Sequence, residues 1–190
     1  MKFVDITIRN IFIILAMLLH FPVLLVHADI EGGHHDFSDE PWASTQLCIV
    51  CHAGHNTAQA SLWNHQISQA NYILYESSYG AHSEQPGMNS VTRFCLSCHD
   101  GTVPIDSFGN RQGSKYIEGS IGTNLNNHHP VSVEYNSNLV WHLKDPSSPS
   151  GQGGTIEEDL LRNGMVECIS CHNPHNETDP NELCLSCHQM

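Results

Sequence analysis

The chain has 190 residues, and its 20 aspartates and glutamates outnumber its 7 lysines and arginines, which gives a formal net charge of −13. This charge disfavours nucleic acid and anionic membrane surfaces as partners, and it favours basic or metal-containing ones. Aliphatic and aromatic residues are too few and too scattered for a large side-chain core, whereas the chain has 15 histidines and 8 cysteines.

The N-terminus has the pattern of a secretory signal peptide. Two basic residues precede an apolar run over 11–26, and the small residue Ala28 follows it. We expect residues 1–28 to be a signal peptide that is cleaved after Ala28. An uncleaved anchor is the alternative, but sixteen residues that include histidine and proline make a poor membrane span. The mature domain would then be 29–190, not membrane-spanning, in the periplasm or outside the cell.

The next segment is polar and acidic up to the first cysteine. Residues 29–46 contain His34 and His35 and predict an extended arm. Farther along, Thr57–Tyr75 has a loosely helical spacing of apolar residues, which predicts a short helix or two.

The middle of the chain predicts one helix and several loops. Ser90 is a suitable N-cap for a short helix that carries the second cysteine pair. Residues 100–127 are rich in Gly, Asn and Ser and predict an ordered loop, while 131–135 alternate and predict a short strand. The Pro-, Ser- and Gly-rich segment 146–154 predicts a linker.

The C-terminal segment predicts two short helices. Thr155 and Glu158 have the spacing of a capping box, which opens a helix through Leu161 with Gly164 as its stop. Asn181 is in position to cap the last helix.

Four Cys-x-x-Cys-His motifs occur, at 48–52, 95–99, 168–172 and 184–188, and they contain all eight cysteines. Cys-x-x-Cys-His is the attachment signature of c-type haem. Each thiol adds to a haem vinyl group, and the histidine that follows binds the iron as its proximal ligand. The expected attachment residues are Cys48, Cys51, Cys95, Cys98, Cys168, Cys171, Cys184 and Cys187, and the expected proximal ligands are His52, His99, His172 and His188.

Other chemistry could use the same cysteines. Paired Cys-x-x-Cys units can hold structural zinc, a single pair can be a thiol–disulfide redox centre, and eight cysteines in an exported chain can form disulfides. None of these requires a histidine directly after the second cysteine. All four motifs have one, which favours haem.

Four haems would also supply the missing core, because each is a large flat apolar body. We expect a mostly α fold with little regular secondary structure, in which short helices and long loops wrap four covalently bound c-type haems. Without haem the chain should be largely unfolded. The CHxxHN and CLSCH patterns each occur twice, which suggests two-haem halves over about 29–145 and 155–190.

The second axial ligand of each iron decides the function. Methionine competes for this role through Met88 and Met165, but histidine is far more abundant, so we expect bis-histidine ligation of all four haems. Nine histidines of the mature chain lie outside the motifs: His34, His35, His55, His65, His82, His128, His129, His142 and His175.

Four of the nine are the favoured distal ligands. His55 and His175 each follow a proximal histidine by three residues, so each can bind the iron of a neighbouring haem. His65 and His129 are the other choices. His128, His82 and His142 are reserves, followed by His34 and His35; a histidine not used in this way would be a solvated or hydrogen-bonding side chain.

The segments CHAGHN, LWNH, FCLSCHDGT, NHHPVSVEY, CHNPHN and LCLSCH, between His52 and His188, resemble the doubled-CXXCH multihaem cytochromes, a group near the cytochrome c3-like electron carriers. This resemblance implies low-potential bis-histidine haems and electron transfer in the periplasm or outside the cell. Some tetrahaem cytochromes of this size polymerise into filaments, in which a histidine of one subunit binds a haem of the next. His34 and His35 would suit such a donation.

Three functions follow from these expectations. The first is a carrier that passes single electrons between redox proteins, such as other multihaem cytochromes or a membrane-bound oxidoreductase, and that is not an enzyme. The second is a haem enzyme with one open iron that converts nitrogen oxides or hydroxylamine, although its typical Cys-x-x-Cys-Lys site is absent. The third, compatible with the first, is a homo-oligomer or filament subunit.

Overall fold

The computed structural model describes most of the expected mature domain. The described residues are 30–43, 46–54, 62–77, 82–88, 90–175 and 183–189. The expected signal peptide, residues 1–28, lies outside them. Over the described ranges, no helix has the length and apolar character needed to cross a membrane.

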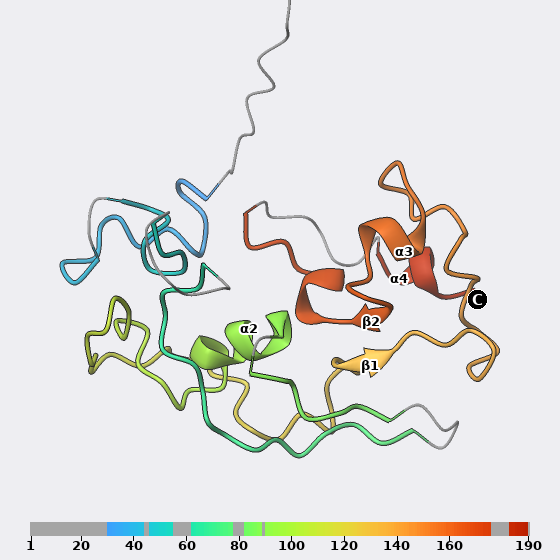
Figure 1. The fold of residues 1–190 in the computed structure, drawn as a ribbon, viewed down its shortest axis with the longest axis horizontal. Coiled ribbons are helices and arrows are strands. Elements are labelled where there is room, and N and C mark those ends of the chain that lie inside the picture. Colours follow the sequence, from blue (N-terminus) through green and yellow to red (C-terminus); the bar gives the residue numbers. More distant parts are fainter. Residues whose placement is uncertain are drawn as a thin grey trace, which may run out of the picture.

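Regular secondary structure is sparse in the described residues. The elements are the helices α2 (Val91–His99), α3 (Ile156–Asp159) and α4 (Cys184–Cys187), the 3-10 helix η1 (Cys168–Ser170) and the strands β1 (Val133–Glu134) and β2 (Met165–Val166). In the elongated molecule, α2 lies near the middle and α3 and α4 lie at the C-terminal end (Figure 1). Long loops connect them. How the chain wraps haem stays a prediction.

Helix α2 begins at the residue that the sequence indicates. The hydroxyl of Ser90 accepts a hydrogen bond from the backbone N–H of Arg93 at 3.2 Å, which satisfies a donor of the first turn. At the other end, the N–H of Asp100 donates to the carbonyl of Leu96 at 2.9 Å. The predicted N-cap is therefore confirmed, and the helix carries Cys95 and Cys98.

The predicted capping box of α3 is also confirmed. The N–H of Glu158 donates to the Thr155 hydroxyl at 3.2 Å, and the N–H of Thr155 donates to the Glu158 carboxylate at 3.0 Å. The helix ends at Asp159, earlier than the expected Leu161. A turn that uses positive φ at Gly164 follows and leads into β2.

The strand expected over 131–135 is confirmed for two residues. β1 pairs antiparallel with β2, with Val133 opposite Val166 and Glu134 opposite Met165. Because β2 ends just before the third Cys-x-x-Cys-His motif, this small sheet holds that motif against the middle of the chain.

The arm expected to be extended is instead a series of turns over residues 30–43. Backbone N–H groups donate to carbonyls three residues earlier, including Gly33 to Ile30 at 2.9 Å and Asp36 to Gly33 at 3.0 Å. The side chain of Trp42 packs against Phe37 with ring centroids 5.4 Å apart. The prediction is wrong because a polar composition does not distinguish an extended arm from a series of locally hydrogen-bonded turns.

The helix expected within Thr57–Tyr75 is absent from the part that is described, 62–75. This part is extended, and its backbone groups bond to distant segments; the N–H of Asn64, for example, donates to the carbonyl of Cys51 at 2.9 Å. The apolar residues here lack a clear helical period, so long-range pairing decides the conformation.

The segment expected to be a linker, 146–154, is folded. Ser150 is only 1% exposed, and its N–H donates to the carbonyl of Gly154 at 3.0 Å. The hydroxyl of Ser186, on α4, donates to the carbonyl of Ser150 at 2.5 Å. The loop therefore ties α3 to α4. The division into two-haem halves stays a prediction.

The apolar core of the described residues consists of small clusters, as the composition predicts. One cluster lies around α2 and contains Tyr72, Leu96 and Leu125. The other contains Tyr135, Ile156 and Leu161. Neither is large enough to be the core of a domain of this length, so much of the interior depends on polar contacts or on bound groups.

A buried polar network fixes the C-terminal end of α2. Asp100 accepts hydrogen bonds from the hydroxyls of Ser68 and Tyr72 at 2.6 and 2.7 Å and from the N–H of Thr102 at 2.7 Å. Burial alone would raise the pKa of Asp100, but these hydrogen bonds outweigh it and lower that pKa. Since Asp100 directly follows His99, the network holds this histidine in place.

Substitution of Tyr72 tests the network. Tyr72→Phe removes a donor to a buried carboxylate, which should lower the free energy of unfolding by about 1–3 kcal/mol. Tyr116→Phe is the matched control, since Tyr116 is 56% exposed and should tolerate the change. Urea unfolding of the purified protein, followed by circular dichroism, measures both. Equal effects of the two substitutions would contradict the role of the network.

The same tyrosine predicts a pH dependence. Burial raises the pKa of Tyr72 to about 12, whereas an unfolded tyrosine titrates near pH 10. Between these values the unfolded chain loses its proton first, so the stabilisation by Tyr72 falls as the pH rises. The stability difference between the wild type and Tyr72→Phe should therefore shrink from pH about 10 to about 12. A constant difference in urea unfolding over this range would be evidence against it.

Candidate haem site

Each of the four Cys-x-x-Cys-His motifs forms a helix or a helix-like turn. In the first, third and fourth motifs, the N–H of the histidine donates to the carbonyl of the first cysteine at 2.8, 3.0 and 2.9 Å. The second motif lies within α2. A helical turn places residues i, i+3 and i+4 on one side, so each motif can present two sulfurs and one imidazole together. All eight cysteines are described, and none of them is in a disulfide.

Consecutive motifs are neighbours in space. The Cys95 thiol of the second motif is hydrogen-bonded to Cys168 of the third, and this contact raises the pKa of Cys95. Burial raises the pKa of Cys98 to about 12, and the nearby Cys51 of the first motif adds to the shift. Similarly, burial and then Cys171 raise the pKa of Cys187 in the fourth motif. The attachment sites therefore follow one another in sequence order.

Hydrogen bonds fix the second and third motifs against each other. The Glu167 carboxylate accepts from the N–H of Thr92 at 3.0 Å, and the Thr92 hydroxyl accepts from the N–H of Cys168 at 3.3 Å. Both Thr92 and Glu167 are buried. These two hydrogen bonds join the start of α2 to η1, the 3-10 helix that begins the third motif.

Aromatic contacts hold the first motif against α2. The indole of Trp63 lies parallel to the ring of Phe94, with centroids 4.7 Å apart and 12° between planes. Trp63 also contacts the His52 ring edge-on, at a centroid distance of 6.4 Å. Trp63 therefore connects His52, the expected proximal ligand of the first motif, to the helix that carries the second motif.

Three expected proximal histidines each lie near another imidazole, at closely similar distances. The ring centroids are 5.9 Å apart for His52 and His175, 5.9 Å for His99 and His35, and 6.1 Å for His188 and His129. A metal binds an imidazole nitrogen at about 2 Å, so two imidazoles on opposite sides of one iron have centroids about 6 Å apart. All three pairs match the spacing that bis-histidine ligation requires.

His129 is also oriented as a ligand. Its Nδ1 lies 3.1 Å from the carbonyl oxygen of Pro130. A carbonyl only accepts, so this contact favours the tautomer with the proton on Nδ1, in which Nε2 has the lone pair, the arrangement common among metal-bound histidines. A second imidazole, His142, lies nearer to His188, with centroids 5.1 Å apart. Burial, then His142 and His129, lower the pKa of His188, which favours the neutral form that binds metal.

His65 lies beside the second attachment site, but in a different arrangement. It is only 4% exposed, and its Nε2 lies 3.5 Å from the sulfur of Cys98. Nδ1 faces the carbonyl of Gln66 at 2.8 Å and Nε2 faces that of Pro104 at 3.1 Å. Its ring would have to turn to bind iron, and its expected role as a ligand stays a prediction.

At the third motif, the described residues include the expected proximal ligand, His172, and no imidazole is assigned to its opposite side. His172 is exposed. The pKa of His99 is lowered mainly by the burial of His99 and secondly by the nearby His172. His55, one of the expected distal ligands, lies outside the described residues. The sequence predicts His35 and His142 only as lower-ranked distal ligands, because no local pattern indicates which distant histidine the fold will bring to a motif.

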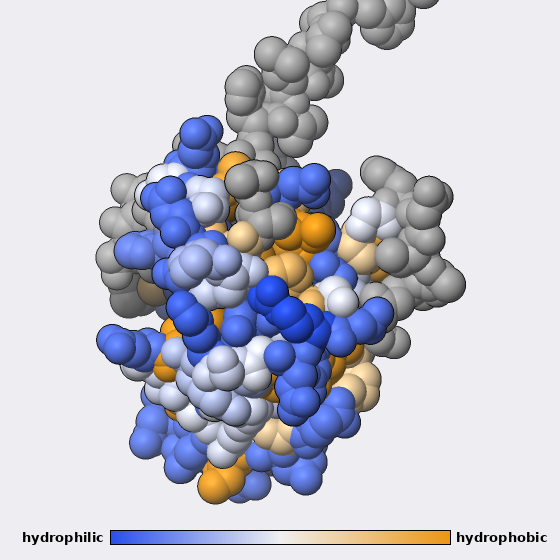
Figure 2. Space-filling view, turned by 90° about the vertical axis from the view of Figure 1, so that its left-hand side faces the viewer, coloured by the Kyte–Doolittle hydropathy of each residue, from blue (hydrophilic) through white to orange (hydrophobic). Residues whose placement is uncertain are grey.

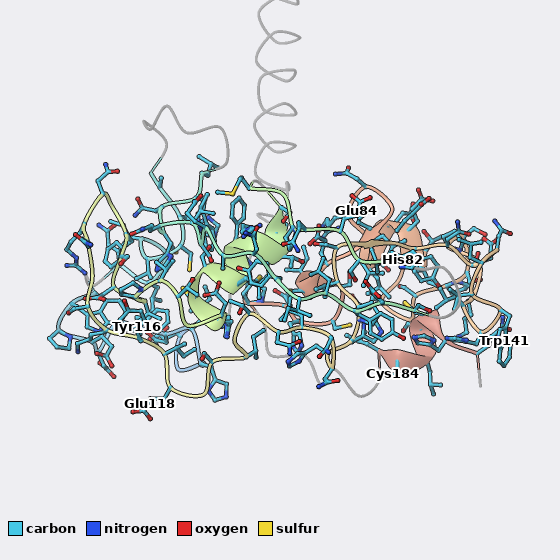
Figure 3. The ribbon with its side chains drawn as sticks, turned by 90° about the horizontal axis from the view of Figure 1, so that it is seen from below. His82, Glu84, Tyr116, Glu118, Trp141 and Cys184 are labelled. Atoms are coloured by element: carbon cyan, nitrogen blue, oxygen red, sulfur yellow. The ribbon has the colours of Figure 1, made fainter. Side chains whose placement is uncertain are left out.

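The fourth motif borders an open apolar cavity. Its volume is about 420 Å³, and its lining residues are Trp141, His142, Cys184, Leu185, His188 and Gln189. Trp141 is 74% exposed and lies at the same end of the molecule as Cys184 (Figure 3). An apolar cavity with an attachment thiol and a proximal imidazole in its wall fits a flat apolar cofactor.

The opposite end has a different surface. Tyr116 and Glu118 lie there (Figure 3), and hydrophilic side chains cover most of this face, with hydrophobic ones gathered near its centre (Figure 2). The ion pair between Lys115 and Glu40, at 3.6 Å, belongs to this end. The two ends of the row of motifs therefore present different surfaces to a partner.

Comparison with known proteins adds no identification. No family model matches the chain, and no curated protein matches it. Among the described residues, no group of three or more His, Cys, Asp or Glu side chains is arranged to hold a bare metal ion.

The orientation of His129 predicts its effect on the spectrum. His129→Ala in the haem-loaded protein should convert one haem of four from low spin to high spin, because the iron loses an axial ligand. His128→Ala is the matched control, an exposed neighbour of the same type. Electron paramagnetic resonance measures the spin state. If His129→Ala stays fully low-spin while His142→Ala does not, His142 is the ligand instead.

Proposed function

We propose that the chain is an exported tetrahaem c-type cytochrome that transfers single electrons through closely spaced, bis-histidine haems, and that it is not an enzyme. The observation that carries the proposal is the pairing of imidazoles about 6 Å apart at three of four Cys-x-x-Cys-His motifs. The resemblance of the motifs to the doubled-CXXCH multihaem cytochromes supports it independently.

Each residue type has a separate task in this proposal. The eight motif cysteines would form thioether bonds, and His52, His99, His172 and His188 would be the proximal ligands. His175 and His129 would complete the first and fourth sites, while His55 and His65 stay predicted ligands. The haem iron supplies a centre that alternates between two oxidation states. By filling both axial positions, the histidines would exclude substrate and let the chain act as a carrier.

The order of the sites gives the path. The cysteines of the second and third motifs are hydrogen-bonded, and those of the first and second motifs and of the third and fourth motifs are close enough to interact electrostatically. Electrons would pass along this row in sequence order. The fourth site, beside the exposed Trp141, would exchange electrons with a redox protein at that end. Other multihaem cytochromes or a membrane-bound oxidoreductase are the partners that the resemblance implies, in the periplasm or outside the cell.

The proposal predicts a defined haem content and spin state. The purified protein should contain four haems per chain by pyridine haemochrome assay, all of them low-spin by electron paramagnetic resonance. Nitrite, hydroxylamine and cyanide should leave the visible spectrum unchanged, because every iron already has two axial ligands. A high-spin fraction that shifts on addition of these ligands would instead favour the haem enzyme. Fewer than four haems would contradict the tetrahaem assignment.

A further inference from the structure

We propose that His35 is the distal ligand of the second haem, so that the N-terminal segment folds back and completes a site of its own chain. The inference rests on the proposed function, because it assumes haem at Cys95 and Cys98. His35 and His99 lie with ring centroids 5.9 Å apart and 69° between planes. Two imidazoles on one iron need this spacing, and ligation leaves the angle between their planes free.

The loop around His35 is built to hold that side chain in place. The Asp36 carboxylate accepts from the N–H of Gly32 at 2.7 Å and from the N–H of Ser38 at 2.9 Å. The first bond closes a turn of backbone that contains His35, and the second forms an Asx turn directly after it. His35 is half-buried, whereas its neighbour His34 is exposed.

Contacts farther along fix the N-terminal segment to the body of the protein. The ring of Trp42 lies 6.2 Å from that of Phe108, and the Arg111 guanidinium donates to the carbonyl of Trp42 at 3.0 Å. The Arg111 guanidinium also lies over the ring of Phe108, at 4.7 Å from its centroid. The segment is therefore anchored at its far end, beyond the turn that carries His35.

The other side of the pair is equally constrained. His99 is the last residue of α2, and the bonds to the following Asp100 fix the direction in which this helix ends. His65 is a weaker candidate for this iron, because both its ring nitrogens face carbonyl oxygens.

The test compares two adjacent histidines in the haem-loaded, full-length protein. His35→Ala should convert one of four haems to high spin and allow one cyanide to bind per chain, while His34→Ala should do neither. Added imidazole should restore the low-spin spectrum of His35→Ala by entering the empty position. A His35→Ala variant that stays fully low-spin would overturn the inference.

Two controls separate this inference from its premise. A pyridine haemochrome count of four in His35→Ala shows that the variant still folds and carries its haems. If the count is lower, the same spectra are recorded on His35→Met, which retains an axial donor and should remain low-spin. If the wild type itself lacks four low-spin haems, the proposed function fails instead. Dilution of the wild type to a monomer, checked by sedimentation velocity, should leave it low-spin; loss of low spin would mean that a second copy supplies the ligand.

Discussion

The helical turn of each Cys-x-x-Cys-His motif is the constraint on which the rest of the site depends. It places two sulfurs and one imidazole on the same side of the chain within five residues, and it needs only one backbone hydrogen bond to do so. Everything else has to come from elsewhere in the chain: the opposite imidazole, the apolar walls and the neighbouring motif. The long loops bring these parts to each motif.

Helix α2 is the hub of these longer contacts. Its start is bonded to the third motif through Thr92 and Glu167, and its end is held by Asp100. Its side packs against Trp63, which also contacts His52 of the first motif. The buried Arg93 adds to this by donating to the carbonyls of Pro86 and Ala70 at 2.7 and 2.6 Å. The polar contacts at α2 thus connect segments that small apolar clusters alone could not hold.

Helix caps, which have a side-chain signature, could be predicted from the sequence, whereas the local turns of residues 30–43 and the distant contacts could not. The caps at Ser90 and Thr155 depend on side chains within three residues, so their patterns identify them. By contrast, the backbone of Asn64 bonds to Cys51 and Gly109, and the helix predicted there from loosely spaced apolar residues is wrong. The pairing of His35 with His99 spans 64 positions, and nothing around either residue specifies it.

The pairing of His52 with His175 has a consequence for biogenesis. The two residues are separated by 123 positions. If the chain is exported from its N-terminus as proposed, three motifs would leave the cell before His175 could follow. If His175 is the second axial ligand of the first site, that site would receive its haem early in export and its second ligand only near the end. The exported chain would then pass through a stage in which its first iron is open to small molecules, and only the arrival of the C-terminal segment would close it.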